Sequence, residues 1–196
     1  MSVRSLRSLA VGTTLSICVA VTCAATSAAF KAGVFDPPRQ APEFSLQGSD
    51  GHELDLNRYR GKVILLAFGY SSCTAVCPIT LNTFAQALRK LGPAASAVQV
   101  VYVTVDPERD TPARLKKFLG AFDPTFMGGT GTEQQLEQVR KDYGVSAKKI
   151  PYGNTYSYDH SSFTYLLDRG GRIRALMPYG HSPDDFVNDL NILLRE

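Results

Sequence analysis

The chain has 196 residues, of which 44% are hydrophobic and 20% are charged, a composition that suits one globular domain with a sizeable core. Its formal net charge at pH 7 is only +3, and its Lys and Arg residues are scattered along the sequence. The chain therefore lacks the strongly basic, clustered charge that is typical of a nucleic-acid-binding protein, so no nucleic-acid partner is expected.

Residues 1–29 have the features of an export signal. Arg4 and Arg7 form a basic beginning, the run from Leu9 to Ala25 is apolar, and Ser27-Ala28-Ala29 offers the small residues at which such a segment is cleaved. The segment is therefore predicted to be a signal peptide or an N-terminal membrane anchor. Either form predicts an exported protein on the periplasmic side.

Residues 9–30 are about as long as the roughly 20-residue helix that crosses a bilayer. Cleavage and anchoring both stay open, so the exported part is either soluble or tethered to the inner membrane. Cys18 and Cys23 lie inside this run and are assigned no role. The remaining cysteines, Cys73 and Cys77, would meet an oxidising compartment in which a pair is readily oxidised.

The elements after the leader begin with an extended segment. Residues 30–40, with two adjacent prolines, are predicted to be a linker, and residues 41–196 are predicted to form one domain. Apolar and polar side chains alternate from Ala41 to Leu46 and from His52 to Leu56, which predicts a β-hairpin. The continuous apolar run from Val63 to Phe68 predicts a strand that is buried on both faces.

Helices and strands then alternate along the chain. Apolar spacing and caps predict helices at 79–91, 112–122 and 132–143 and from 182 onward, strands at 98–105, 126–128, 161–167 and 172–177, and a loop at 148–158. This order predicts an α/β protein with a thioredoxin-like fold, in which helices flank a central mixed sheet and an extra N-terminal β-hairpin is added.

Cys73 and Cys77 lie where the strand ending at Phe68 passes into the first helix. If that helix begins at or before Cys73, the two thiols lie at positions i and i+4 on one face, where they can chelate one metal ion. They can also form a disulfide or act as a redox pair, although thiol oxidoreductases usually separate their cysteines by two residues. The spacing favours a metal without excluding redox chemistry.

The three histidines occupy different predicted positions. His160 opens the strand expected beside the cysteine strand, so its ring is expected to reach the same sheet edge. His52 is expected to be a solvated surface residue, and His181 to belong to a helix cap. Asp106 and Asp110 are assigned to turn and cap structure. Two thiolates with one imidazole suit copper, because thiolate selects Cu(I) and imidazole also serves Cu(II), whereas zinc usually requires a fourth ligand.

Three sequence blocks resemble the Sco/SenC family. They are Phe68 through Cys73-Thr74-Ala75-Val76-Cys77-Pro78, Val103-Thr104-Val105-Asp106-Pro107 through Pro112, and Asp159-His160-Ser161-Ser162 with the strand to Asp168. The resemblance covers the chain from about Ala41 to the C-terminus. It implies a membrane-tethered, thioredoxin-like copper protein that delivers copper to the dinuclear Cu-A centre of cytochrome c oxidase.

The resemblance also implies that Cys73, Cys77 and His160 bind copper, as Cu(I), Cu(II) or both. Thr74-Ala75 replaces the Pro-Asp that the family often has between its cysteines, and the leader is a poorer membrane span than the family usually has. The implied partners are the oxidase subunit carrying Cu-A or another cuproprotein, an upstream copper donor and a thiol reductant.

The predicted function is thus a copper-binding metallochaperone that loads Cu-A or keeps its cysteines reduced, with no catalytic residues beyond the redox-active candidates Cys73 and Cys77. The alternative is an exported thiol-disulfide oxidoreductase that uses the same pair. Such enzymes place a proline immediately before the strand facing their cysteines, whereas Tyr158-Asp159-His160 stands there and the nearest proline is Pro151. A peroxidase is disfavoured because the Thr-x-x-Cys pattern is absent.

Overall fold

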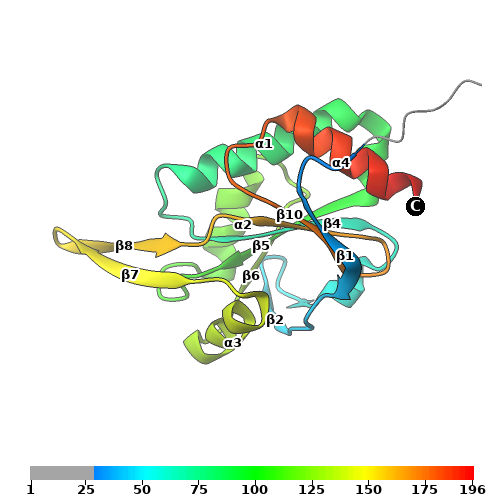
Figure 1. Cartoon of the computed structure of the whole chain (residues 1–196). Helices are drawn as coiled ribbons and strands as arrows, with labels where there is room; N and C mark the ends of the chain where they lie inside the picture. The colour runs from blue at the N-terminus through cyan, green and yellow to red at the C-terminus, as the bar shows by residue number, and fades with distance from the viewer. Residues whose placement is uncertain (1–28) are drawn as a thin grey trace, which may run out of the picture.

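A computed structural model describes residues 29–196, so the predicted signal or anchor segment, with Cys18 and Cys23, lies outside the described residues. Eight strands form one sheet in the order β1-β10-β9-β4-β5-β6-β2-β3 (Figure 1). Their bounds are β1 Gly33–Gln40, β2 Leu46–Gly48, β3 Glu53–Leu54, β4 Val63–Gly69, β5 Val98–Thr104, β6 Met127–Thr130, β9 Thr164–Leu167 and β10 Arg172–Met177. No helix within the described residues is long and apolar enough to cross a membrane.

The sheet is mixed at its centre. Strands β4, β5 and β6 run parallel, β9 is antiparallel to β4, and β10 returns beside β9. The helices are α1 Val76–Leu91, α2 Pro112–Gly120, α3 Glu133–Tyr143 and α4 Pro183–Arg195. Helices α1 and α4 lie together on one face, and α3 lies on the other (Figure 1). The thioredoxin-like fold is confirmed, and so is the N-terminal hairpin β2-β3, which extends the sheet beyond β6.

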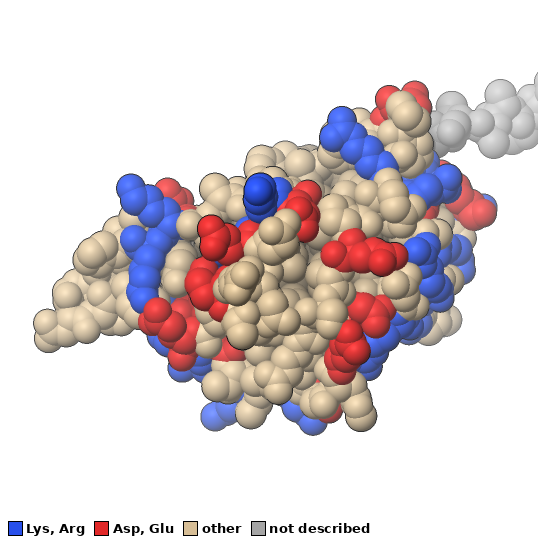
Figure 2. Space-filling view, turned by 90° about the horizontal axis from the view of Figure 1, so that it is seen from below, with Lys and Arg blue, Asp and Glu red and all other residues tan. Residues whose placement is uncertain are grey.

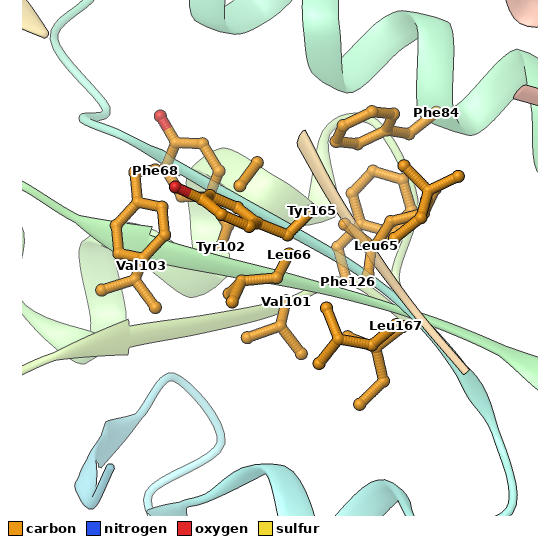
Figure 3. Close-up of a cluster of buried hydrophobic side chains, with 14 of the residues drawn as sticks. Leu65, Leu66, Phe68, Phe84, Val101, Tyr102, Val103, Phe126, Tyr165 and Leu167 are labelled. Atoms are coloured by element: carbon orange, nitrogen blue, oxygen red, sulfur yellow. The ribbon is translucent and has the colours of Figure 1, made fainter. Parts of the chain in front are cut away.

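The core lies on the two central strands. Every residue of β4 and of β5 is buried, which is why neither strand alternates apolar with polar side chains. Figure 3 shows Leu65 and Leu66 of β4 beside Val101 of β5, with Phe84 of α1 close by. Each such aliphatic or aromatic side chain contributes about 1.5 to 3 kcal/mol by leaving water, so the β4-β5 pair is a rigid platform for the residues that follow it.

Three of the helices begin where the sequence predicts. The side chains of Thr111, Thr132 and Ser182 accept hydrogen bonds from the backbone N–H of the third helical residue in α2, α3 and α4. The last two form complete capping boxes with Gln135 and Asp185. The prediction succeeds here because a cap is a local interaction, complete within four residues.

Residues 33–40 are not the predicted linker. They form β1, which pairs antiparallel with β10 at the sheet edge, with Gly33 opposite Leu176 and Gln40 opposite Arg172. Pro37 and Pro38 fall where the pairing register is interrupted, and prolines are tolerated on an edge strand because its outer N–H groups need no partner. The described chain is therefore attached to the sheet almost from its beginning.

The predicted loop at 148–158 is also wrong. Strands β7 (Ala147–Tyr152) and β8 (Thr155–His160) pair antiparallel in a separate two-stranded ribbon that projects from the body (Figure 1). Gly153, with φ of 57°, supplies the left-handed turn residue. Pro151 is tolerated because both strands of a two-stranded ribbon are edge strands. His160 consequently ends β8, and the next strand begins only at Thr164.

Candidate metal centre

The two cysteines lie on either side of the beginning of α1. The helix begins at Val76, so Cys77 is helical while Cys73 lies in the preceding loop, where its N–H donates to the carbonyl of Tyr70 at 3.2 Å. The i and i+4 placement on one helical face is therefore wrong. Both thiols are free, Cys77 is only 3% exposed, and Cys73 is partly exposed. The pair thus consists of an inner thiol and an outer thiol.

Asp110 holds the cysteine loop in place. Its carboxylate is fully buried and accepts hydrogen bonds from the backbone N–H of Ser71 at 2.9 Å and the hydroxyl of Thr104 at 2.6 Å. Arg114 approaches the same carboxylate at 3.7 Å and donates to the hydroxyl of Ser72 at 2.9 Å. Asp110 therefore joins β5, α2 and the cysteine loop, a role beyond the local turn that its Asp-Thr-Pro sequence indicated.

Gly69 allows Cys77 to pack against the end of β4. A Cβ atom at this position would collide with the hydroxyl of Tyr102 and lie 2.8 Å from the Cys77 sulfur. Tyr102 is buried, and its hydroxyl has no hydrogen-bond partner among residues 29–196. A phenol beside a sulfur favours the thiolate form, so Tyr102 is suited to support a deprotonated, metal-binding Cys77.

His160 presents a free nitrogen lone pair to Cys77. Its Nδ1 atom lies 2.9 Å from the carbonyl oxygen of Ser161, so we assign the ring proton to Nδ1. Its Nε2 atom then faces the Cys77 sulfur at 3.7 Å. Tyr70 packs edge-on against the imidazole with ring centroids 5.9 Å apart, and its hydroxyl accepts the N–H of Tyr158 at 3.3 Å. These contacts fix the ring orientation that a metal ligand needs.

A cluster around Tyr156 attaches strand β8 of the ribbon to the body. Arg109 donates to the Tyr156 carbonyl at 3.0 Å, and the Tyr156 hydroxyl donates to Asp106 at 3.0 Å and Glu108 at 2.9 Å. The guanidinium of Arg109 and the ammonium of Lys149 each lie 3.8 Å from the Tyr156 ring centroid. The Asp106 turn thus positions the strand that ends at His160, which the sequence did not reveal because Tyr156 was assigned to a loop.

The outer thiol opens onto a hollow at this edge of the sheet. The hollow has a volume of about 370 Å³, and its lining includes Cys73, His160, Tyr70 and Tyr158. Within the described residues, no three His, Cys, Asp or Glu side chains are already closed into a metal cage. The structure therefore brings Cys73, Cys77 and His160 to one edge in an open arrangement.

The other two histidines lie elsewhere. His181 contacts Asp185 at the beginning of α4, with 3.3 Å between Nδ1 and Oδ2, and His52 is exposed in the turn between β2 and β3. Neither ring contacts a cysteine among the described residues. Both positions agree with the capping and surface roles predicted from the sequence.

The two thiols differ in acidity. The hydrogen bond that Cys77 donates to the Cys73 thiolate lowers the pKa of Cys73 to about 3, against the opposing effect of partial burial. The same bond, together with burial, raises the pKa of Cys77. Cys73 is therefore the thiolate of the reduced pair, and Cys77 carries the proton that a metal must displace.

Cys73 is accordingly expected to react first with an alkylating agent. When reduced protein meets one equivalent of iodoacetamide at neutral pH, Cys73 should be modified at least about tenfold faster than Cys77, because it is more exposed than Cys77 and is ionised. Peptide mass spectrometry would locate the label, and Cys73→Ser serves as the control in which Cys77 stays slow. Equal labelling of the two thiols would contradict the inner and outer assignment.

The mixed sheet with two thiols and an imidazole at the edge beyond β4 defines a thioredoxin-like protein with a candidate copper site. The profile of the SCO1/SenC family matches residues 35–195, and the chain belongs to this family. An SCO2-like protein of Rickettsia conorii is 34% identical over 152 residues, which cover 76% of this chain and 74% of that protein.

Comparison with solved structures also identifies Sco proteins. The chain is similar to copper-bound ScoI of Bradyrhizobium japonicum, with 35% identity and a TM-score of 0.73 over 79% of this chain and 99% of that one. It is also similar to copper-bound yeast Sco1, with 29% identity and a TM-score of 0.72 over 81% of this chain and 90% of that one. The family predicted from three short sequence blocks is confirmed.

Proposed function

We propose that this protein is a copper chaperone for the assembly of cytochrome c oxidase, which binds copper through Cys73, Cys77 and His160 and passes it to the subunit carrying Cu-A. The observation that carries the proposal is the approach of His160 Nε2 to 3.7 Å from the Cys77 sulfur, beside Cys73. Membership of the SCO1/SenC family and the copper-bound relatives support it. Thiolate and imidazole together suit both copper oxidation states.

The separation of sulfur and nitrogen fits a shared metal. Metal–sulfur and metal–imidazole bonds of about 2.3 Å and 2.0 Å, as at zinc, place two ligands of one tetrahedral or trigonal ion roughly 3.5 Å apart. Cys77 and His160 already lie 3.7 Å apart. Copper therefore requires little movement of these two side chains, and Cys73 would complete the site from the loop that precedes α1.

The inner and outer thiols suggest an order of transfer. Cys73 borders the open hollow, so an incoming thiolate of the recipient can replace Cys73 on the metal first and the buried Cys77 last. Only deprotonated thiols ligate copper, so the pair must be kept reduced, and a thiol reductant is a required partner besides an upstream copper donor. The export signal predicted in residues 1–29 supports action on the periplasmic side, either soluble or tethered by residues 9–30.

One observation favours thiol-disulfide oxidoreductase activity as a second function. An exposed thiol with a lowered pKa next to a buried thiol is the arrangement of an attacking and a resolving cysteine. Against it, residues 161–163 before β9 contain no proline, and His160 faces the thiol where such an enzyme would hold its substrate backbone. Copper chaperone function therefore remains the proposal.

A metal titration tests the proposal. Reduced protein comprising residues 29–196 is expected to bind one copper ion per chain. Binding is measured by the thiolate-to-copper charge-transfer absorption. Protein oxidised to the Cys73–Cys77 disulfide should bind no copper tightly. Reduced protein that takes up no copper but turns over disulfide substrates would identify the oxidoreductase instead.

A further inference from the structure

Basic side chains gather at the end of the sheet opposite the cysteines. Arg60 donates to the carbonyl of Gly170, and Arg169 donates at 3.1 Å to the carbonyls of Gly61 and Leu194, so separate segments meet there. Figure 2 shows Lys and Arg side chains along the side on which the described chain begins. We call the group the basic face; its members are Arg39, Arg60, Lys62, Arg169, Arg172, Arg174 and Arg195.

Carboxylates do not balance the charge of the basic face. Asp168 pairs with Arg172 and Arg174, Glu196 pairs with Arg174, and the charge of Asp36 also acts on Arg174. These three side chains face seven cations. The described chain is close to neutral as a whole, because Arg4 and Arg7 account for most of the +3. A concentration of cations on a near-neutral domain is typical of a surface that meets a polyanion. Within residues 29–196, no ion pair is formed by Arg39, Arg60, Lys62, Arg169 or Arg195.

The position at which the described chain begins indicates which polyanion this surface meets. The N–H groups of Lys31 and Ala32 donate to the buried Asp189 at 2.7 and 2.9 Å, and the ring of Phe30 lies 5.9 Å from the Arg174 guanidinium. The chain is thus fixed beside the basic face from residue 30 onward. The apolar run of the leader ends at Ala25.

Residues 26–29, which separate that run from the body, span at most about 14 Å when extended. This upper limit is about one and a half times the Debye length of roughly 8 to 10 Å at physiological salt. A bilayer that holds the apolar run is therefore kept close enough to the basic face for electrostatic attraction. Nothing comparable keeps a soluble acidic protein near this face.

We propose that the basic face binds the anionic headgroups of a lipid surface. Lys and Arg residues next to a membrane-inserted segment are attracted by the negative potential of anionic lipids. Strand β4 has seven residues and spans about 20 Å between this end and the cysteine loop. Contact through the basic face would therefore leave Cys73 and Cys77 facing away from the lipid. The inference does not depend on copper binding.

Vesicle flotation with the full chain tests the inference. The leader contributes apolar binding to every vesicle, so the ratio of partition coefficients between phosphatidylcholine vesicles and vesicles with about one third phosphatidylglycerol isolates the charge effect. We expect at least about a tenfold preference for the anionic vesicles near physiological salt. The preference should be lost near 1 M salt, where the Debye length is about 3 Å.

Two variants with the same change in net charge separate the basic face from charge in general. Arg39→Glu/Lys62→Glu/Arg195→Glu should lose the anionic preference, whereas Lys116→Glu/Lys117→Glu/Lys141→Glu, at exposed positions on α2 and α3, should keep it. Circular dichroism checks that both fold. The inference is overturned if the unmodified chain shows no preference, if both variants lose it equally, or if the basic face binds polyglutamate but not the anionic vesicles.

Discussion

Replacing Cys77 with serine is expected to abolish tight copper binding. Cys77 is proposed to be one of two soft ligands. Loss of a ligand should weaken binding by more than the 10- to 100-fold that is typical when a residue orienting a ligand is lost, so we expect Cu(I) affinity to fall more than about 100-fold. Cys73→Ser should act in the same way. The measurement is competition with a chromophoric Cu(I) chelator, using residues 29–196 so that Cys18 and Cys23 are absent.

The serine variants are expected to remain folded. Serine keeps the shape of cysteine, and Cys73 lies in a partly exposed loop that Asp110 holds through Ser71 rather than through the thiol. Thr74→Ser, next to Cys73 but without a ligand, is the matched control and should bind copper as the parent does. Tight, stoichiometric binding by either cysteine variant would refute the assignment of the thiols.

Replacing His160 with alanine is expected to weaken Cu(II) binding selectively. Cu(I) is satisfied by two thiolates, whereas Cu(II) takes more ligands and accepts nitrogen donors, so Cu(II) affinity should fall at least about tenfold and Cu(I) affinity by only a few-fold. The variant should fold, because His160 ends a projecting ribbon that the Tyr156 cluster attaches independently. Parallel Cu(I) and Cu(II) titrations, with the Cu(II) charge-transfer spectrum, provide the measurement.

His181→Ala is the matched control for His160→Ala. It removes the same ring from the beginning of α4, where His181 contacts Asp185 rather than a cysteine, so both copper affinities should stay unchanged. Equal losses of Cu(I) and Cu(II) affinity in His160→Ala would show that the ring is structural. If His181→Ala removed the Cu(II) spectrum and His160→Ala did not, the copper ligand would be His181 and the assignment of His160 would be wrong.

The elements that depend on non-local partners were predicted least well. β1 and the β7-β8 ribbon were assigned to a linker and a loop because they contain prolines, a signal that weighs against a strand when sequence is considered alone. Both are edge strands, where a missing N–H costs nothing. Whether a segment lies at an edge depends on its neighbours in the sheet, which are β10 for β1 and the β8 strand for β7.

The fold class, the caps of three helices, the family and the three candidate ligands could all be predicted from the amino-acid sequence. Each depends on local chemistry: a continuous apolar run for β4, a Thr or Ser at a helix start, and cysteines and a histidine in short characteristic blocks. The parallel order of strands then places the ends of β4 and β5 at one edge, which is why a site beyond Phe68 could be expected there.

The way in which that site is built became visible only in the folded chain. It divided the thiols into an inner Cys77 and an outer Cys73 by beginning α1 at Val76, and it brought Asp110 from beyond β5 to the cysteine loop. It also gathered basic residues that lie far apart in the sequence on one face. The burial and acidity of the thiols and the charge of the surface depend on which segments contact one another, and the packing around the sheet determines those contacts.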